Sequence, residues 1–428
     1  MRQVLGFRER VGHSRGDGIF LRPFTMRRTN DALIPVLVFG TTVTALGAAR
    51  TFARLGHPVW THTEPGDVVT LSRYYQPLPL PAGFDPKAPT AARLESILRA
   101  LPVPKAFLLP CSDFWTEAAT ELPDDLKARF PACVSPRETI YTLTDKGRLA
   151  ATMATLGLPH PRSFAVEDEQ DFAAIDDRVF ESAFLKPKSS PLFLQVFKAK
   201  GIHVHSRAEA LARFREVKAA GFEVILQEYV PGPPTEHFFI DGFMDQHHVV
   251  QARFARQRLR MFPPDFGNST YMVSVPIATV QPAMDALDTL LRHLRYRGIF
   301  SAEYKRDARD GKFHLIEVNA RPWWYVGYAE HCGVPVCEMA YADALGLPLP
   351  TQPPYPIGTR CVYPHIDSKE YRWRRQQRME HASLLAYAGA WLTSHKPVFA
   401  WDDPRPAISG SMTLLGQSLR KRLGLGKA

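Results

Sequence analysis

The sequence has little of what several common classes of protein require. Its five cysteines are scattered and odd in number, which argues against a close-spaced metal site and favours a reducing compartment over a disulfide framework. No apolar run approaches the roughly 18 residues that a transmembrane helix needs. The first thirty residues contain no apolar core long enough for a secretory signal. These absences predict a cytoplasmic protein with no transmembrane segment.

Acidic residues are scarce at both ends of the chain, and the net charge of +10 comes mostly from there. Residues 1–30 hold seven arginines against two acidic residues, and residues 417–428 hold four basic residues and no acidic one. The body is therefore close to neutral. Basic ends do not make a fold that reads nucleic acid, so we expect no nucleic-acid partner. Residues 1–34 are predicted to form a basic, disordered extension, with Met26 as an alternative start.

The dinucleotide-binding fingerprint G-x-G-x-x-G is also missing from the first αβ region. A strand over residues 36–39, a helix over 44–55 and a strand over 57–60 predict a Rossmann-like topology. The glycines at the first turn, Gly40 and Gly47, are too far apart for that fingerprint, so a nicotinamide is not expected. Cys111 follows a later strand, and we interpret it as a packing residue because no histidine has a recognisable partnering motif.

A hairpin with three oxygen donors is the most informative feature that is present. Residues 301–307 and 316–321 alternate polar and apolar side chains, as half-buried strands do, and Asp310-Gly311 between them suits a tight turn. The hairpin would bring Glu303 nearly opposite Glu317, and Asn319 would project from the same face. Two carboxylates and an amide oxygen suit a hard cation such as Mg²⁺, although solvated cross-strand charges would explain the pair equally well. Arg321, just beyond, is placed to hold an anion.

Three further segments upstream of the hairpin strengthen this interpretation. Residues 144–146 (Thr-Asp-Lys) open a helical segment, residues 184–187 end an apolar run in Lys-Pro, and residues 224–232 join an apolar strand to a Pro-Gly turn. In order, spacing and type, the four pieces resemble the ATP-grasp enzymes, which join a carboxylate to an amine with ATP. The resemblance covers roughly residues 36–345. It implies ATP and Mg²⁺ as cofactors, with Mn²⁺ as an alternative ion.

The resemblance also implies how the phosphates are held. Lys146 and Lys186 would hold the α- and β-phosphates as point charges, although either lysine alone is more often a solvated surface charge. The family usually covers the phosphates with a glycine-rich loop after the second lysine. Residues 188–193 read Lys-Ser-Ser-Pro-Leu-Phe instead, which predicts a stiffer and more apolar loop.

The adenosine contacts follow from the same resemblance. The backbone N–H of Val230 would bind the adenine ring, and the region of Gln227 and Glu228 would accept a hydrogen bond from its exocyclic amine. The family often has a glutamate where Gln227 stands, and the amide oxygen can still accept. Glu236 would accept from the ribose hydroxyls; an exposed loop acid is the alternative interpretation.

Alternating arginines precede the hairpin, and aromatic residues follow it. Arg256, Arg258 and Arg260 would lie on one face of a strand and could hold a carboxylate or a phosphoryl group; a basic surface strand is the alternative. We expect Arg258 and Arg321 to steady the transferred group. Residues 323–325 (Trp-Trp-Tyr) would line a substrate pocket or belong to the core.

The sequence as a whole predicts an α/β protein with α+β grasp lobes. A Rossmann-like domain (35–144) would precede an ATP-grasp domain (145–345, lobes about 146–232 and 233–345) and a C-terminal region (346–428) with helices and a basic tail. The predicted function is an ADP-forming carboxylate–amine ligase that works through an acyl-phosphate, with small substrates such as amino acids or peptides. A homo-oligomer is left open. The alternatives are an ATP-binding protein without turnover and a nicotinamide-dependent oxidoreductase.

Overall fold

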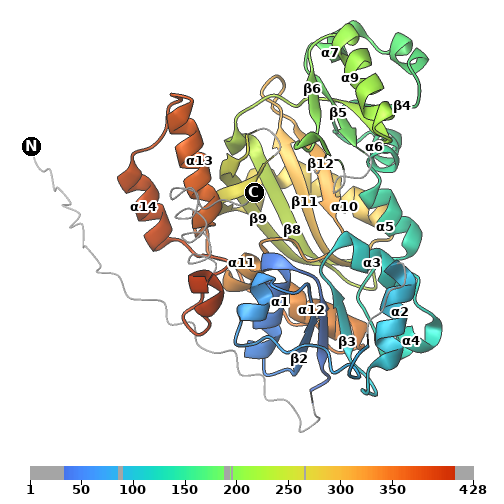
Figure 1. Cartoon of the computed structure of the whole chain (residues 1–428), viewed down its shortest axis with the longest axis vertical. Helices are drawn as coiled ribbons and strands as arrows, with labels where there is room; N and C mark the ends of the chain where they lie inside the picture. The colour runs from blue at the N-terminus through green and yellow to red at the C-terminus, as the bar shows by residue number, and fades with distance from the viewer. Residues whose placement is uncertain (1–32, 85–89, 188–192, 194–195, 265–266, 410–428) are drawn as a thin grey trace, which may run out of the picture. The chain divides into compact units, whose positions relative to one another are not determined.

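The computed structural model describes residues 33–84, 90–187, 193, 196–264 and 267–409 (Figure 1). All the helices and strands described below belong to one compact unit, Ile34–Ala428. The basic extension, most of the segment 188–193 and the basic tail from residue 410 lie outside the described residues.

The first part of the chain forms a three-stranded parallel sheet in the order β2-β1-β3. Its strands are β1 (Val36–Phe39), β2 (Val59–His62) and β3 (Phe107–Pro110). The helices of this part are α1 (Thr42–Arg54), α2 (Thr90–Ala100), α3 (Asp113–Thr120) and α4 (Asp124–Arg129), with the 3₁₀ turn η1 (Val68–Leu71). β1 and β3 are wholly buried because helices cover both faces of the sheet. This arrangement agrees with the predicted alternation of strands and helices, and the Rossmann-like label stays a prediction.

Gly40 shows why the first strand ends as it does. A Cβ atom at this position would lie 2.6 Å from the Cβ of Cys111, so only glycine lets the end of β1 approach the end of β3 this closely. Cys111 is buried against this contact, and burial raises the pKa of its thiol to about 12. The thiol therefore stays protonated, which agrees with the interpretation of Cys111 as a packing residue.

The middle of the chain forms a four-stranded antiparallel sheet in the order β4-β7-β5-β6. Its strands are β4 (Ser163–Val166), β5 (Ala183–Pro187), β6 (Ile202–Val204) and β7 (Val224–Glu228). The helices before and around it are α5 (Arg137–Thr144), α6 (Lys146–Thr155), η2 (Gln170–Ala174), α7 (Asp177–Phe180) and α9 (Arg207–Ala219). Asp145 caps α6 by accepting a hydrogen bond from the Arg148 N–H, which puts Lys146 at the first helical position, as predicted.

The largest sheet has six strands in the order β12-β11-β8-β9-β10-β13 and lies at the centre of Figure 1. Its strands are β8 (His237–Met244), β9 (Val250–Phe262), β10 (Asn268–Val275), β11 (Gly298–Arg306), β12 (Phe313–Asn319) and β13 (Arg360–Val362). The helices here are η3 (Pro234–Glu236), η4 (Ile277–Val280), α10 (Gln281–His293), α11 (Val326–His331) and α12 (Val336–Ala344).

Two hydrophobic cores cover the opposite faces of this sheet. Ile240 and Ala302 pack with Leu287 of α10 in one core, and Phe243 and Phe254 pack in the other with β1, α1, α11 and α12. Because both faces are covered, β8 is buried throughout and β11 is buried at seven of its nine positions. The expectation that the first hairpin strand is half-buried was therefore wrong.

The C-terminal region closes the edge of the large sheet. It contains β13, α13 (Pro364–Gln376) and α14 (Leu384–Thr393), and these two helices agree with the helical stretches predicted there. Beyond them, the buried carboxylate of Asp403 binds the Arg50 Nε of α1 at 2.9 Å and the Arg73 N–H at 2.9 Å. Among the described residues, no helix has both the length and the apolar character that crossing a membrane requires.

Candidate active site

The predicted hairpin is formed by β11 and β12. In the antiparallel register, Glu303 pairs with Glu317 and Ser301 pairs with Asn319, so the expected pairing of the two glutamates is confirmed. The Asn319 Nδ2 lies 3.4 Å from the Glu317 Oε1, on the same face of β12. Three oxygen-bearing side chains are therefore brought to one place by two adjacent strands.

Glu303 is held by two partners that come from the neighbouring strands. Its Oε1 lies 3.0 Å from a guanidinium nitrogen of Arg258 and 2.7 Å from the His237 Nδ1. Burial by itself would raise the pKa of Glu303, but Arg258 and His237 outweigh it and the pKa is lowered. The pKa of His237 is lowered to about 4, first by burial and then by Arg258. At neutral pH, Glu303 is thus an anion and His237 is neutral, so the Nδ1–H of His237 donates to the carboxylate.

The donor set of the hairpin fits a hard divalent cation. The contacts of Glu303 with His237 and Arg258 are both made through Oε1. Glu317 is the exposed member of the set, which gives a cation and its ligands access from solvent. Two carboxylates and an amide oxygen are the ligands that Mg²⁺ accepts in nucleotide sites.

The two predicted lysines meet beside this hairpin. Lys146, at the start of α6, donates to the Pro187 carbonyl at 3.1 Å, and Lys186, on β5, donates to the Gln227 Oε1 at 3.3 Å. Burial, then repulsion from Lys146, lowers the pKa of Lys186 to about 8, and attraction by Glu317 opposes the shift. Burial likewise lowers the pKa of Lys146, again against Glu317. Two crowded cations that face a carboxylate are an arrangement that a bound polyanion would stabilise.

A cleft of about 530 Å³ lies between the lysine-bearing helix and the hairpin. Its lining includes Lys146, Gln227, Glu317 and Asn319, which come from segments up to 173 residues apart in the sequence. Asp113 of α3 also lines it. The cleft has the size of a site for a small molecule, and Lys146 shares its wall with several carboxylates.

The hinge residues lie at the end of β7, with their side chains already engaged. The Gln227 amide accepts from Lys186 and donates to the Ser163 Oγ at 2.8 Å. The Glu228 carboxylate is held by Arg162 at 2.9 Å and by Arg309 at 2.7 Å. The side chains of Gln227 and Glu228 are therefore taken up by protein partners, a constraint that their local sequence did not predict.

The other two predicted adenosine contacts, Val230 and Glu236, differ in whether they already have a protein partner. The Val230 N–H is buried, and it has no hydrogen-bond partner among the described residues, so it can donate to a ligand. Glu236 forms an ion pair with Arg306, with contacts of 2.5 and 3.1 Å. Glu236 is thus a half-buried acid paired with a guanidinium of β11, and the ribose contact and the exposed loop acid both stay open.

The three alternating arginines do not form one open basic face. Arg256 binds Asp241 at 2.6 Å, and Arg260 binds Asp367 of α13 with two hydrogen bonds. Of the three, Arg258 alone contacts the hairpin carboxylates, through Glu303. A buried guanidinium requires a partner, and each of these arginines has a carboxylate. The expectation that all three hold a substrate was wrong for Arg260, which instead fixes the C-terminal region.

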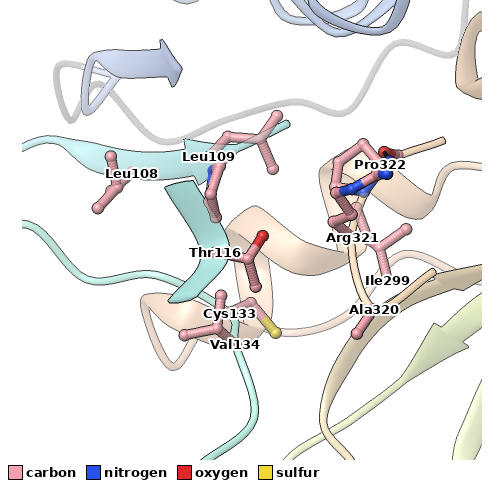
Figure 2. A pocket seen from close by; sticks show the side chains of 10 residues that line it. Leu108, Leu109, Thr116, Cys133, Val134, Ile299, Ala320, Arg321 and Pro322 are labelled. Carbon is pink, nitrogen blue, oxygen red and sulfur yellow. Dashed lines mark hydrogen bonds between the residues drawn. The ribbon is translucent and has the colours of Figure 1, made fainter. Parts of the chain in front are cut away.

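Arg321 is held by a carboxylate from the first part of the chain. Its guanidinium makes two hydrogen bonds to Asp113, of 2.6 and 3.0 Å, and Asp113 opens α3, which Ser112 caps. Figure 2 shows Arg321 and Pro322 beside Ala320 and Ile299, facing Leu109 and Thr116 across a small cavity. Sequence reasoning did not indicate Asp113 as a partner of Arg321, although it lies three residues after the end of β3, at the start of α3. A capping serine next to an acid at that place is the signal that could have found it.

Arg321 leads into the aromatic run, whose members differ in burial. Trp323 and Tyr325 are buried in the core that α11 and α12 share with the first sheet, and Trp324 packs against it partly buried. The interpretation as core residues is thus confirmed for Trp323 and Tyr325. His237 is a further residue that the sequence did not indicate, because nothing in its neighbourhood marks it as a partner of Glu303.

Comparisons with known proteins were made on the sequence and on the fold. No protein-family model matches the chain. The sequence is 23% identical over 306 residues to a D-aspartate ligase of Enterococcus faecium, covering 68% of this chain and 72% of that protein. It is 23% identical over 212 residues to a D-alanine–D-alanine ligase of Neisseria meningitidis, covering 46% of this chain and 64% of the relative. The chain therefore spans less than two thirds of the second relative.

The fold matches solved structures over a larger share of the chain. The biotin carboxylase domain of a 2-oxoglutarate carboxylase from Hydrogenobacter thermophilus, solved with MgADP, superposes with a TM-score of 0.57 at 14% identity. The match covers 76% of this chain and 73% of that one. This fold and these sequence relatives support the predicted resemblance to the ATP-grasp superfamily.

Proposed function

We propose that the chain is an ATP-dependent carboxylate–amine ligase that releases ADP and phosphate. One observation carries the proposal: Glu303 and Glu317 are cross-strand partners, and Lys146, Lys186, Arg258 and Arg321 all act electrostatically on Glu317 or Glu303. Such a mixture of carboxylates and cations suits a metal–nucleotide complex, whose phosphates need cations and whose metal needs oxygen ligands. The ligase names of both relatives support the same class of reaction.

The lysines and the hinge would hold the nucleotide. Lys146 and Lys186 come from different elements and would hold the α- and β-phosphates. The Val230 N–H would donate to adenine, and the backbone of Gln227 and Glu228 is a better candidate for the exocyclic amine than their engaged side chains. Glu236 would accept from the ribose, in competition with Arg306.

The hairpin would hold the metal, and the two arginines would hold the transferred group. Glu303, Glu317 and Asn319 are the proposed ligands of Mg²⁺, which when bound neutralises charge on the terminal phosphates. Arg258 and Arg321 would stabilise the charge on the γ-phosphoryl group while a substrate carboxylate attacks it. The products of this step are ADP and an acyl-phosphate. Asp113 positions Arg321 because it binds the guanidinium from outside the hairpin.

An amine would then attack the acyl carbonyl and release phosphate, which leaves an amide. The protein mainly contributes position and charge to this step, and exclusion of water would prevent hydrolysis of the acyl-phosphate. The relatives are named for D-aspartate and D-alanine, so we propose amino acids as the substrate class. The Rossmann-like domain (35–144) would contribute to the acceptor side, and residues 145–345 would bind the nucleotide.

The proposal is tested by measuring ADP release from ATP with pools of D- and L-amino acids. A hit should require Mg²⁺, and Glu317→Gln should lower its rate by at least about a hundredfold. Asp310→Asn, in the exposed turn of the same hairpin, is the matched control and should leave the rate unchanged. Tight ATP binding without turnover over the whole panel would favour the non-catalytic alternative. NADH binding without ATP binding would favour an oxidoreductase.

A further inference from the structure

A second cleft, separate from the proposed nucleotide site, has a volume of about 690 Å³. It lies among the end of α3, the segment from α4 to α5, and the turn between α10 and β11. It shares no lining residue with the cleft of Lys146 and Glu317. We call it the basic cleft, because Lys127, His248, Arg295 and Arg297 line it and none of its described lining residues is acidic.

The basic residues of the basic cleft differ in how they are held. Arg297 is fixed by Asp343 at 2.6 Å, and the His248 Nδ1 is held by the Tyr296 carbonyl at 2.9 Å. Lys127 and Arg295 are exposed and make no ion pair with any described residue. Two fixed basic groups and two unpaired cations therefore share one concave surface, and an anion that enters it meets no described carboxylate on its wall.

The backbone supports the same interpretation. Arg295 and His248 both have positive φ, of 49° and 61°. Arg295 follows α10 at the place where a helix usually ends in glycine, because its N–H bonds the Arg292 carbonyl and the next N–H bonds the Leu291 carbonyl. A side chain at such a position costs free energy that glycine would avoid. At both positions the chain has a basic side chain that points to this cleft.

The other residues that line the basic cleft indicate that its ligand also has an apolar part. Leu122, Phe130 and Leu294 contribute apolar surface, and Pro136 precedes the N-terminus of α5, which has no side-chain cap. Free N–H groups at a helix start add to the attraction for an anion. The volume lies in the range of about 300–1,000 Å³ that small-molecule sites occupy.

We propose that the basic cleft binds a small organic anion with an apolar body, such as an aryl phosphate. The anionic group would contact Lys127 and Arg295, and the apolar body would pack on Phe130 and Leu294. This proposal does not depend on ligase activity, because it concerns a surface that the proposed nucleotide site does not use.

Phenyl phosphate is the test ligand, titrated calorimetrically into the full chain with and without saturating MgADP. We expect binding in both conditions, weaker binding of inorganic phosphate, and no binding of benzylamine, which has the ring but the opposite charge. Binding that MgADP abolishes would assign phenyl phosphate to the nucleotide site and overturn the proposal. Absence of binding up to millimolar concentrations would also overturn it.

The chain offers a matched control for the variant. Lys127→Ala with Arg295→Gly should weaken phenyl phosphate binding by at least about tenfold, since each charged contact is worth about that factor. Arg378→Gly is the control, because Arg378 has φ of 55° and the same two helix-ending hydrogen bonds, at the end of α13. Both glycines relieve the same backbone conformation, so stability is not expected to fall in either variant. Equal affinity in the double variant and the wild type would refute the site.

Discussion

The lowered pKa of Lys186 predicts that the protein takes up a proton near pH 8 when it binds ATP. Its pKa is lowered to about 8, first by burial and then by Lys146, and phosphates would favour the charged form. At pH 7 about nine tenths of the lysines carry a charge, and at pH 9 about one tenth do, so affinity should fall about tenfold between them. The terminal phosphate titrates near pH 6 and does not contribute in this window.

Calorimetry in buffers of different ionisation enthalpy measures the proton uptake directly. We expect about half a proton at pH 8 in the wild type. In Lys186→Arg the uptake should disappear, because a guanidinium stays charged throughout this range. Uptake that persists unchanged in that variant, or affinity that is constant from pH 7 to pH 9, would refute the reasoning.

In the protein without ligand, the lowered pKa of Lys186 makes the fold more stable as the pH rises. The folded pKa lies below the unfolded value, so the buried charge destabilises the fold below pH 8, and this cost disappears as pH rises from 8 towards 10.5. Lys186→Met should therefore raise the melting temperature at pH 7, by a gain of at most on the order of 3 kcal/mol, while it weakens ATP binding. A lower melting temperature would contradict this.

Three further outcomes are expected. Glu303→Gln leaves Arg258 without its carboxylate, so activity should fall at least about a hundredfold and denaturant unfolding should show a loss of about 3–5 kcal/mol; an unchanged midpoint would be inconsistent with the pair. Asp113→Asn should lower kcat more than it changes the ATP Kd, because it positions Arg321 by two hydrogen bonds; equal effects on both would remove that role. Asp403→Asn should destabilise the protein by about 3–5 kcal/mol in urea titrations without changing ATP affinity, since it leaves buried Arg50 unpaired far from the hairpin.

Local patterns predicted the parts of the site that lie on one element or one hairpin. Asp310-Gly311 between two strands predicted the hairpin, but residues 307–312 join β11 to β12 and the register shifts between Glu303 and Tyr304. The pairing of Glu303 with Glu317 therefore depends on this bulge as well as on the turn. The start of α6 at Lys146 followed in the same way from its capping Asp145. Both are consequences of short-range geometry.

The remaining partners are distant in sequence and could not be read from local patterns. Arg321 and Asp113 are 208 residues apart, and Arg260 and Asp367 are 107 apart. No periodicity encodes which carboxylate a buried guanidinium will meet, since that depends on how sheets and helices pack. The alternating arginines therefore indicated a basic face where the structure has three neutralised pairs.

The core beside the first sheet has a consequence for biosynthesis. Val36, Phe52 and Phe107 pack with Tyr328 and Tyr341, and Arg50 receives its carboxylate from Asp403. The first sheet thus obtains part of its apolar cover from residues near positions 328 and 341, and Arg50 of α1 obtains its counter-ion from a residue 353 positions later. During translation, part of the apolar surface of the N-terminal segment therefore stays uncovered until these later segments have been synthesised.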